Sequence, residues 1–422
     1  MTEDVFDVVV IGGGPSGMMA AGRAGEAGAK VLLLERNRNL GRKLLLTGKG
    51  RGNVSRAEFN PKDLVGQYGR EGDFLLHALS VFGPRETVEF FEKRGLGLKV
   101  ERGKRIFPES DEAEDVLKAL LEYLKEGNVR IMTGLQAKRI IARGNRIEKI
   151  VLKDNKEIFS RNYIVCTGGK SYPGTGSVGE GYGWLEKLGH TIIKPRPALV
   201  PLRIKESWPR HSQGLSLKNV KLTVVQDDKK KDFRFGEMLF THFGISGPIV
   251  LDLSGKIGEL LEKGKVRLVL DLKPALDFQT LDKRLQSDFL KYGSKLFRNS
   301  LDDLLPQKLI PVIVKLSGID SEKKTNEVRR EERLKLLRLL KGMEMEVIDT
   351  LGFENAIVTL GGVSLKEIDA KTMGSKIVDN LFLAGEIINL HGPTGGYNLQ
   401  QSWSTGYLAG QSAALSQTKN RP

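Results

Sequence analysis

The chain has 422 residues, of which 40% are hydrophobic and 28% charged, a composition that fits two or three globular domains. Its single cysteine, Cys166, excludes an intramolecular disulfide, and no apolar run approaches the roughly 20 residues that a membrane span needs. Acidic Glu3 and Asp4 stand where an export signal is basic. We therefore expect a cytoplasmic protein with no membrane partner. The formal net charge of +15 favours anionic ligands.

Residues 7–35 follow the pattern of a nucleotide-binding βαβ unit. Asp7–Ile11 is a short apolar run that predicts a buried parallel strand, and Val31–Glu35 predicts a second one. Between them, Gly12–Gly17 has the spacing G-x-G-x-x-G and leads into a helix rich in alanine and glycine. This order of strand, glycine turn, helix and strand is typical of a Rossmann-like domain.

Each glycine of this turn has a separate task. Gly12 permits the tight turn, Gly14 lets the backbone approach a pyrophosphate, and Gly17 lets the helix pack closely on the strand. The unpaired N–H groups at the start of the helix receive the phosphates. Glu35, about 20 residues further on, is placed to accept a ribose hydroxyl. The sequence therefore predicts an adenine dinucleotide site.

Helical and strand patterns then alternate up to about residue 193. Two loops are rich in glycine, the basic loop Gly41–Asn53 and the later loop Gly168–Gly183. Apolar residues at helical spacing predict helices over Phe74–Leu79, Pro84–Arg94, Val116–Leu124 and Trp184–Leu188. Alternating or continuous apolar runs predict strands over Val129–Thr133, Ala137–Arg143, Arg146–Lys153, Glu157–Ser160 and Tyr163–Cys166.

The composition changes near Pro195, Pro197 and Pro201, which marks the start of an inserted domain. Short alternating strands predict an antiparallel β-barrel over about 194–272, and helical spacing predicts helices over about 273–350. We expect an α/β fold in which a Rossmann-like domain of residues 1–193 and 351–422 is interrupted by residues 194–350. The predicted barrel strands are Leu199–Ile204, Val220–Val225, Glu237–Thr241, Ile249–Leu253 and Val266–Leu270.

A second glycine-rich strand end near the C-terminus favours FAD over NAD as the tightly bound cofactor. Leu381–Ala384 reads as a buried strand that ends at Gly385 and Glu386, and Glu386 can bond to the ribityl or phosphate part of an extended cofactor. A helix that starts near Gly396 would aim its N–H groups at the flavin N1–C2=O edge, where negative charge accumulates on reduction. A nicotinamide dehydrogenase with one Rossmann domain does not explain this second site.

Several longer motifs carry a resemblance that runs nearly from end to end of the chain. They are Gly12–Gly17, Gly41–Lys43 with Thr47–Asn53, Gly103–Ser110, Thr167–Gly169, Leu239–Pro248, Thr359–Val363 with Lys371–Met373, and Gly385–Gln400. With these motifs the chain resembles the BaiN/YhiN-like family of FAD-dependent oxidoreductases. The resemblance implies an FAD domain of the two-dinucleotide-binding flavoprotein type with an inserted barrel and helices. It also implies flavin redox chemistry with NAD(P)H as a transient reductant and, in one member, reduction of a carbon–carbon double bond.

The glycine motifs and the family motifs together predict the residues that contact FAD. Lys43, Thr47, Gly48 and Asn53 are included because they lie in a family motif. The complete predicted set is Ile11, Gly12, Gly14, Pro15, Ser16, Gly17, Glu35, Arg36, Lys43, Thr47, Gly48, Asn53, Ala137, Thr167, Gly168, Gly169, Gly385, Glu386, Gly395, Gly396, Asn398, Leu399 and Gln400.

The chain departs from the family at two positions. Gly52 stands where the family usually has a cysteine, so thiol chemistry proposed for that loop is absent here. Asn389 stands where the family often has an aspartate, which removes an acid or an anionic contact. Binding of FAD through the main chain is expected to survive both changes.

The flavin performs the hydride transfer, and the protein has to supply a proton to the substrate carbon. The candidate donors are His391, Tyr397 and His242. No metal site is expected, because the five histidines are scattered and no paired cysteines accompany them. We expect an FAD-dependent oxidoreductase, a reductase that passes hydride from NAD(P)H through the flavin to a small or medium organic acceptor. A conjugated C=C bond is one candidate acceptor.

Two alternatives remain open. One is a flavin oxidase that uses dioxygen on an amine-type substrate. The other is a flavin-bearing nucleic-acid-binding or RNA-modification protein, which the charge of +15 motivates. Because no RNA or DNA module signature is visible, and because the basic segment Glu322–Lys341 reads as the solvated face of an amphipathic helix, nucleic acid is not the expected partner. The sequence contains no signal for an oligomeric state.

Overall fold

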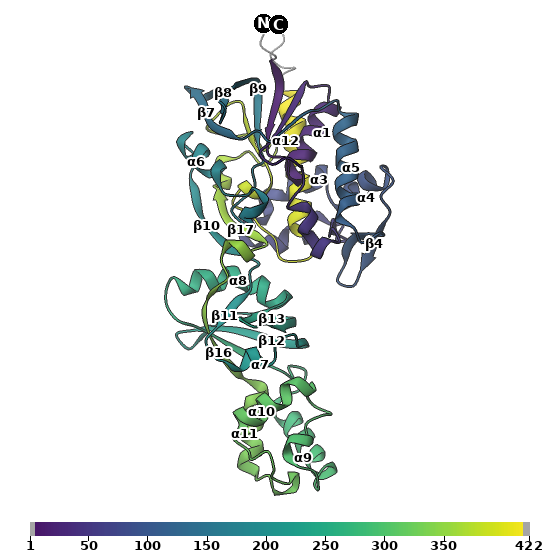
Figure 1. Ribbon diagram of the computed structural model, residues 1–422, viewed down its shortest axis with the longest axis vertical. Helices are drawn as coiled ribbons and strands as arrows, with labels where there is room; N and C mark the ends of the chain where they lie inside the picture. The colour runs from purple at the N-terminus through teal and green to yellow at the C-terminus, as the bar shows by residue number, and fades with distance from the viewer. Residues whose placement is uncertain (1–4, 417–422) are drawn as a thin grey trace. The chain divides into compact units, whose positions relative to one another are not determined.

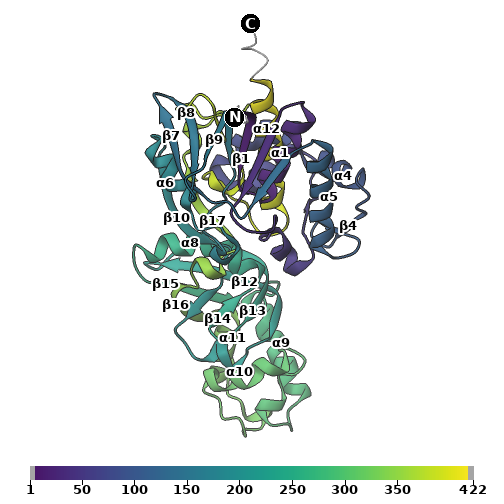
Figure 2. The same cartoon turned by 45° about the horizontal axis from the view of Figure 1, so that its top comes forward.

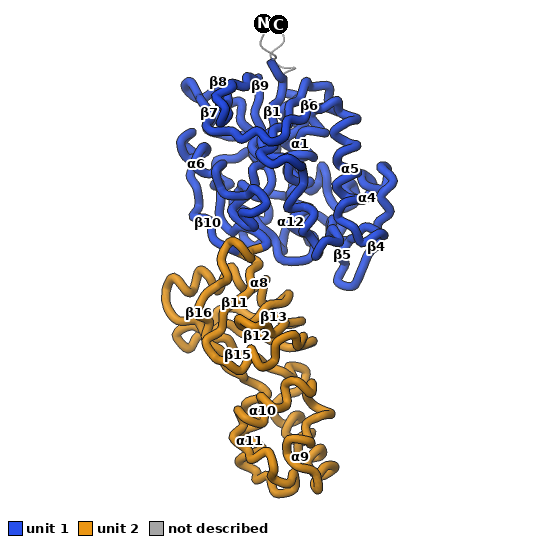
Figure 3. The backbone as a smooth tube through the Cα atoms, in the orientation of Figure 1, with its two compact units in different colours: residues 1–197, 357–422 blue, residues 198–356 orange. Residues whose placement is uncertain are grey.

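A computed structural model of the chain describes residues 5–416, so Glu3 and Asp4 lie outside the described residues. The described residues form two compact units (Figure 3). The first runs up to Pro197 and resumes at Ile357, and the second is Ala198–Ala356. The sequence placed these boundaries at 193/194 and 350/351. Within residues 5–416 no helix has the length and apolar character needed to cross a lipid bilayer.

The first unit is built on a sheet with the strand order β6-β2-β1-β9-β8-β7, to which β18 is added beside β9. Figure 1 labels β7, β8 and β9 of this sheet. At its centre β1 (Phe6–Ile11) lies parallel to β2 (Val31–Glu35) and to β9 (Glu157–Val165), and β18 (Leu381–Leu383) lies parallel to β9. β1, β2, β18 and the last three residues of β9 are largely apolar because these segments are buried on both faces. Their carboxyl ends meet at one edge of the sheet, which is where open α/β sheets bind ligands.

Three helices pack together beside this sheet. α1 (Pro15–Glu26) contacts α12 (Tyr397–Leu415) and α5 (Ala113–Glu126) (Figure 2). The approach of α12 to α1 needs glycine, since a Cβ atom at Gly406 would lie 2.4 Å from the carbonyl oxygen of Ser16. The small residues of α12 therefore bring the C-terminal segment against the N-terminal glycine turn.

The first unit contains one strand where the sequence predicted two. Glu157–Ser160 and Tyr163–Cys166 were expected as separate strands, but both belong to β9. The interrupting Asn162 is polar and buried, and its side chain donates to the carbonyl oxygen of Ala413 at 2.8 Å. The remaining helices and strands of this unit are β3 (Ser55–Arg56), α2 (Pro61–Val65), α3 (Leu76–Val81), α4 (Pro84–Glu92), β4 (Leu98–Glu101), β5 (Arg105–Pro108), β6 (Arg130–Thr133), β7 (Ala137–Arg143), β8 (Arg146–Leu152), α6 (Glu180–Lys187), β10 (Ile192–Ala198) and β17 (Val358–Val363).

The second unit contains a closed six-stranded barrel with the order β11-β14-β13-β12-β15-β16. The closing strand β16 (Met343–Thr350) was expected to be helical. It alternates buried Met343, Met345 and Val347 with more exposed residues, but it follows the preceding helix after a single residue, so the two patterns merge in the sequence. The other barrel strands are β11 (Leu202–Ile204), β12 (Ser216–Gln226), β13 (Lys229–Phe240), β14 (Gly244–Ser246) and β15 (Val266–Asp271).

One predicted barrel strand is a helix. Ile249–Leu253 lies inside α8 (Pro248–Leu261), because Pro248 occupies the first helical turn and a short apolar run does not by itself distinguish a strand from a buried helix. The expected helix over Glu322–Lys341 begins only at α11 (Arg330–Lys341). The other helices of this unit are α7 (Trp208–His211), α9 (Phe278–Lys291) and α10 (Ile310–Ser317). The expected fold class, a Rossmann-like domain with an inserted barrel and helices, is confirmed.

Candidate functional site

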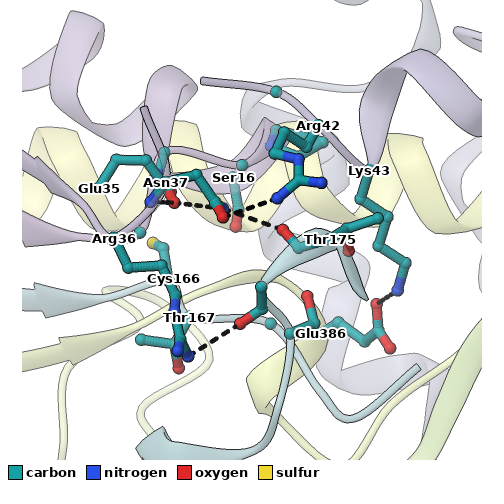
Figure 4. A pocket seen from close by; sticks show the side chains of 18 of the residues that line it. Ser16, Glu35, Arg36, Asn37, Arg42, Lys43, Cys166, Thr167, Thr175 and Glu386 are labelled. Atoms are coloured by element: carbon teal, nitrogen blue, oxygen red, sulfur yellow. Dashed lines mark hydrogen bonds and ion pairs between the residues drawn. The ribbon is translucent and has the colours of Figure 1, made fainter. Parts of the chain in front are cut away.

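A cavity in the first unit opens at the carboxyl ends of the central strands (Figure 4). Its wall combines the glycine turn after β1, the residues after β2, the loop after β9, and residues that follow β18. The predicted cofactor residues that line it are Ile11, Gly12, Gly14, Pro15, Ser16, Glu35, Arg36, Lys43, Thr47, Ala137, Thr167, Gly168, Glu386, Asn398 and Leu399.

The glycine turn leaves room at one position and none at the two others. A Cβ atom at Gly12 would lie 2.4 Å from the carbonyl oxygen of Cys166, and one at Gly17 would lie 1.8 Å from the carbonyl oxygen of Gly12. A Cβ atom at Gly14 would meet nothing within 4 Å, because this glycine faces the cavity. Gly14 is also the N-cap of α1 and supplies no side-chain acceptor, so the first N–H groups of the helix are available to an anion.

The carboxylate of Glu35 is held at the end of β2 by three donors. Its Oε2 accepts from the backbone N–H of Gly13 at 2.8 Å, and its Oε1 accepts from the backbone and side-chain nitrogens of Asn37 at 2.7 and 2.6 Å. The residue is only 7% exposed. Since an ionised carboxylate has about four acceptor positions, one remains for a hydroxyl in the cavity.

Lys43 and Glu386 form an ion pair in another part of the cavity wall (Figure 4). The Lys43 Nζ lies 2.6 Å from Glu386 Oε2 and 2.5 Å from Ser171 Oγ. Glu386 Oε1 accepts from Ser171 Oγ at 2.6 Å and from the backbone N–H of Thr359 at 2.8 Å. The network joins four segments and fixes both charged side chains, which are about one-fifth exposed.

Other lining residues were not predicted as cofactor contacts, among them Asn37, Gln136, Thr175 and Glu180. Arg36 pairs with Glu180 at 3.0 Å, and the other oxygen of Glu180 accepts from Gln136 at 2.5 Å. Asn37 donates to the carbonyl oxygen of Thr175 at 3.0 Å. Thr175, Glu180 and the residues between them belong to the second glycine-rich loop, which the sequence marked without assigning it a role. The glycine content was the one available signal.

The cavity contains an unpaired polar atom. Thr167 Oγ1 is buried and has no hydrogen-bond partner among the described residues. Buried hydroxyls are normally satisfied, so this atom indicates a ligand that supplies the missing partner. Three features of the cavity are suited to an extended dinucleotide such as FAD, which carries phosphates and hydroxyl groups. They are the open space at Gly14, the remaining acceptor position of Glu35 and the unpaired hydroxyl of Thr167.

Eight predicted cofactor residues do not line the cavity. Gln400 is buried and its side chain accepts from Ser55 Oγ at 2.5 Å and from Thr87 Oγ1 at 3.0 Å. With its amide oriented to satisfy its neighbours, Asn53 accepts from the backbone N–H of Gly396 at 2.9 Å. The hydrogen bonds of Gln400 and Asn53 thus stabilise α12 and the loop before it, behind the cavity wall. The full group is Gly17, Gly48, Asn53, Gly169, Gly385, Gly395, Gly396 and Gln400.

None of the three candidate proton donors lines the cavity. His391 is in the first unit, and burial lowers the pKa of its imidazole. The Tyr397 ring packs edge-on against Tyr68 with 5.9 Å between centroids, and the Arg56 guanidinium lies 4.9 Å from its centroid. His242 belongs to the second unit, where it is exposed.

Two other reactive side chains are restrained by their surroundings. Cys166 lines the cavity, and burial raises the pKa of its thiol to about 12, so the thiol stays protonated at neutral pH. Arg51, in the basic loop Gly41–Asn53, donates to Glu101 and Asp111. Within residues 5–416 no three His, Cys, Asp or Glu side chains are grouped as a metal site requires.

Comparisons with known proteins cover nearly the whole chain. The family model described as "HI0933-like protein Rossmann domain" matches residues 6–412. A 3-dehydro-bile acid delta(4,6)-reductase from Clostridium scindens is 34% identical over 96% of this chain and 98% of that protein. A ribosomal RNA dihydrouridine synthase from Escherichia coli is 28% identical over 96% of this chain and 97% of that protein.

A solved structure shares the fold at lower identity. The 3-ketosteroid delta1-dehydrogenase from Sterolibacterium denitrificans superimposes with a TM-score of 0.54 at 13% identity. The match covers 98% of this chain and 100% of that one, so it includes both units. At this identity the likeness concerns the fold alone.

Proposed function

The chain belongs to the HI0933-like family and is an FAD-dependent oxidoreductase, and on that premise we propose that it reduces a carbon–carbon double bond conjugated with a carbonyl group, with NAD(P)H as the reductant. The observation that carries this proposal is a common chemistry in two full-length relatives. A 3-dehydro-bile acid delta(4,6)-reductase and a dihydrouridine synthase both act on such a bond, in a steroid enone and in a uracil ring.

The residues of the cavity have distinct roles in this proposal. FAD, when bound, supplies hydride transfer between NAD(P)H and the acceptor. The first N–H groups of α1 and the open face of Gly14 hold the pyrophosphate, and Glu35 accepts a ribose hydroxyl. The Lys43–Glu386 pair would hold another part of the cofactor, since both side chains line the same cavity. Both side chains are already held in place by hydrogen bonds. They would therefore need little reorganisation to orient the cofactor.

The acceptor carbon next to the carbonyl group has to receive a proton, and His391 and Tyr397 remain our candidates within the first unit. Burial lowers the pKa of His391, so it is neutral at pH 7 and would donate from an uncharged ring nitrogen. Tyr397 follows Gly396 directly at the start of α12, where the helix dipole favours negative charge. For the second unit, we keep His242 as the candidate proton donor. We propose that the protein acts in the cytoplasm, where NAD(P)H is available.

Two acceptors fit this chemistry. The first is a small or medium organic enone, which the 34% identical relative supports. The second is a uridine in RNA, which the net charge of +15 and the 28% identical relative support. A flavin oxidase remains as an alternative to the reductase. It differs from a reductase of either acceptor because it needs no nicotinamide.

Product analysis distinguishes these readings. The FAD-loaded protein is incubated without oxygen with NADPH or NADH and with either a 3-oxo-4,6-diene steroid acid or a uridine-containing ribosomal RNA fragment. We expect one acceptor to gain two hydrogen atoms, as measured by mass spectrometry, with stoichiometric loss of NAD(P)H. Turnover of an amine with dioxygen and without NAD(P)H would favour the oxidase and contradict the proposal.

A further inference from the structure

The barrel of the second unit presents two phenylalanines to solvent on one strand. Phe233 and Phe235 in β13 are 44% and 59% exposed. In the ladder they lie opposite Thr223 and Lys221 of β12, whose side chains alternate with the buried Leu222 and Val224. Because residues two apart on a strand face the same side, both rings stand on the outer face of the barrel.

The two rings differ in what covers them. The ammonium groups of Lys230 and Lys221 lie 3.8 and 5.0 Å from the ring centroid of Phe233. Phe235 makes no ring–ring or cation–ring contact with any residue between 5 and 416. Exposing a large apolar ring to water is unfavourable, so Phe235 offers an uncovered ring to a partner on the outer face of the barrel.

Lysines surround these rings and lack acidic partners. None of five lysines of the hairpin β12–β13 forms an ion pair with a carboxylate of residues 5–416. Three nearby carboxylates are used elsewhere, since Asp232 pairs with Arg234, Asp228 with Arg267, and Asp271 with Lys341. Asp227, in the turn of the hairpin, forms no ion pair with any residue between 5 and 416. The five lysines are Lys218, Lys221, Lys229, Lys230 and Lys231.

We propose that the outer face of the β12–β13 hairpin binds single-stranded RNA, with Phe233 and Phe235 stacking on bases and the hairpin lysines contacting phosphates. Exposed aromatic rings on a barrel strand within a basic surround are the pattern by which single strands are bound, because every base offers a π face and every linkage a negative charge. This deepens the second acceptor candidate and rests on it. It differs from the sequence-based expectation that nucleic acid is not a partner. That expectation weighed the basic segment Glu322–Lys341 and not the run Lys229–Phe235, whose phenylalanines the structure places at the surface.

Fluorescence anisotropy with the FAD-loaded full chain tests the proposal. The probe is a labelled oligouridylate of about 16 nucleotides, within the site sizes of single-strand binding surfaces. We expect Phe233→Ala and Phe235→Ala each to raise the Kd between about fivefold and a hundredfold, which is the range for loss of one stacked base. Ile348→Ala is the matched control, because Ile348 is 51% exposed on strand β16 of the same barrel, and it should leave the Kd unchanged.

The contribution of the lysines is measured by how the Kd depends on salt concentration. Between about 50 and 200 mM salt, Lys230→Gln should reduce the slope of log Kd against log salt by about 0.7, the value for one phosphate contact on a single strand. Equal loss of affinity in the Ile348→Ala control, equal competition by duplex RNA, or no binding by the unaltered chain would each overturn the proposal.

Flavin reduction separates this proposal from the reductase assignment. Neither Phe233→Ala nor Phe235→Ala should change the rate at which NAD(P)H bleaches the flavin, because neither residue lines the cofactor cavity. RNA binding without reductase activity would therefore contradict the proposed function alone, and reductase activity without RNA binding would contradict this surface alone.

Discussion

The backbone N–H of Gly13 donates to the carboxylate of Glu35 across a distance of 2.8 Å. This bond joins the glycine turn after β1 to the end of β2, so the parts of the cavity that we propose for the phosphates and the ribose are fixed relative to each other before a ligand arrives. Preorganisation of this kind raises the affinity for a ligand, because fewer groups lose conformational freedom on binding.

Replacing the carboxylate should weaken cofactor binding. In Glu35→Gln an amide NH₂ replaces one acceptor oxygen, so either the Gly13 or the Asn37 bonds are lost together with the ribose contact. We expect the Kd for FAD to rise about tenfold, which corresponds to about 1.4 kcal/mol. Titration of apoprotein with FAD, followed by quenching of flavin fluorescence, measures this. Glu122→Gln, an exposed change on α5, is the control, and an equal Kd in both variants would contradict the assigned role.

The glycine turn allows a matched pair of substitutions. Gly14→Ala adds a methyl group where nothing lies within 4 Å, so the apoprotein should keep its Tm while the methyl group blocks the pyrophosphate and raises the Kd for FAD at least about tenfold. Gly17→Ala places a Cβ atom 1.8 Å from the carbonyl oxygen of Gly12 and should lower the Tm of the apoprotein itself. Calorimetry with and without FAD measures both effects. Unchanged FAD affinity in Gly14→Ala would contradict the placement of the pyrophosphate.

The sequence could predict the parts of the candidate site whose residues lie in one short segment with a recognisable spacing. Gly12, Gly14 and Glu35 lie within one βαβ unit, where spacing along the chain sets spacing in space. Lys43 and Glu386 were predicted as separate cofactor contacts, but their ion pair joins residues 343 positions apart and leaves no periodic signal. Ser171 and Thr359, which complete that network, were missed for the same reason.

The barrel illustrates the corresponding limit for the fold. The sequence predicted β11, β12, β15 and the end of β13 at least in part, but it missed β14 and most of β13. Closure of the barrel depends on β16, which pairs with both β11 and β15 and follows several helices in the chain. Strand pairing across so many residues is decided by tertiary packing rather than by local preference.

The Lys43–Glu386 pair should show coupling in a double-mutant cycle. Lys43→Met leaves the Glu386 carboxylate without its cation and should lower the free energy of unfolding by about 2 kcal/mol, less than for a fully buried pair because both groups are about one-fifth exposed. Adding Glu386→Gln should recover part of this loss, since the unpaired charge is removed. Urea unfolding of the apoproteins measures each corner of the cycle. Strictly additive losses would show that the two side chains act independently.

Stability should fall below about pH 6.5 because two histidines, the buried His190 and the partly buried His391, are neutral in the folded chain. Burial lowers the pKa of His391 and of His190, so between the folded and unfolded pKa values the unfolded chain binds more protons. Their stabilising contribution is present above the unfolded pKa and is lost as the pH falls through the folded pKa, at up to about 1.4 kcal/mol per pH unit for each group.

Urea unfolding between pH 7.5 and about pH 5 tests this dependence on the histidines. His391→Asn should flatten the slope of the free energy of unfolding against pH. His77→Asn, at an exposed position on α3, should leave the slope as it is in the unaltered chain. Equal slopes in both variants would assign the acid sensitivity to other groups.

The most direct test of the reductase assignment is the visible spectrum of the FAD-loaded protein during anaerobic titration with NADPH and then NADH, followed by addition of a conjugated enone or a uridine-containing RNA. We predict that one nicotinamide bleaches the flavin band and that one of these acceptors restores it without oxygen. A flavin band that neither nicotinamide changes, in protein that carries its full complement of FAD, would contradict the assignment.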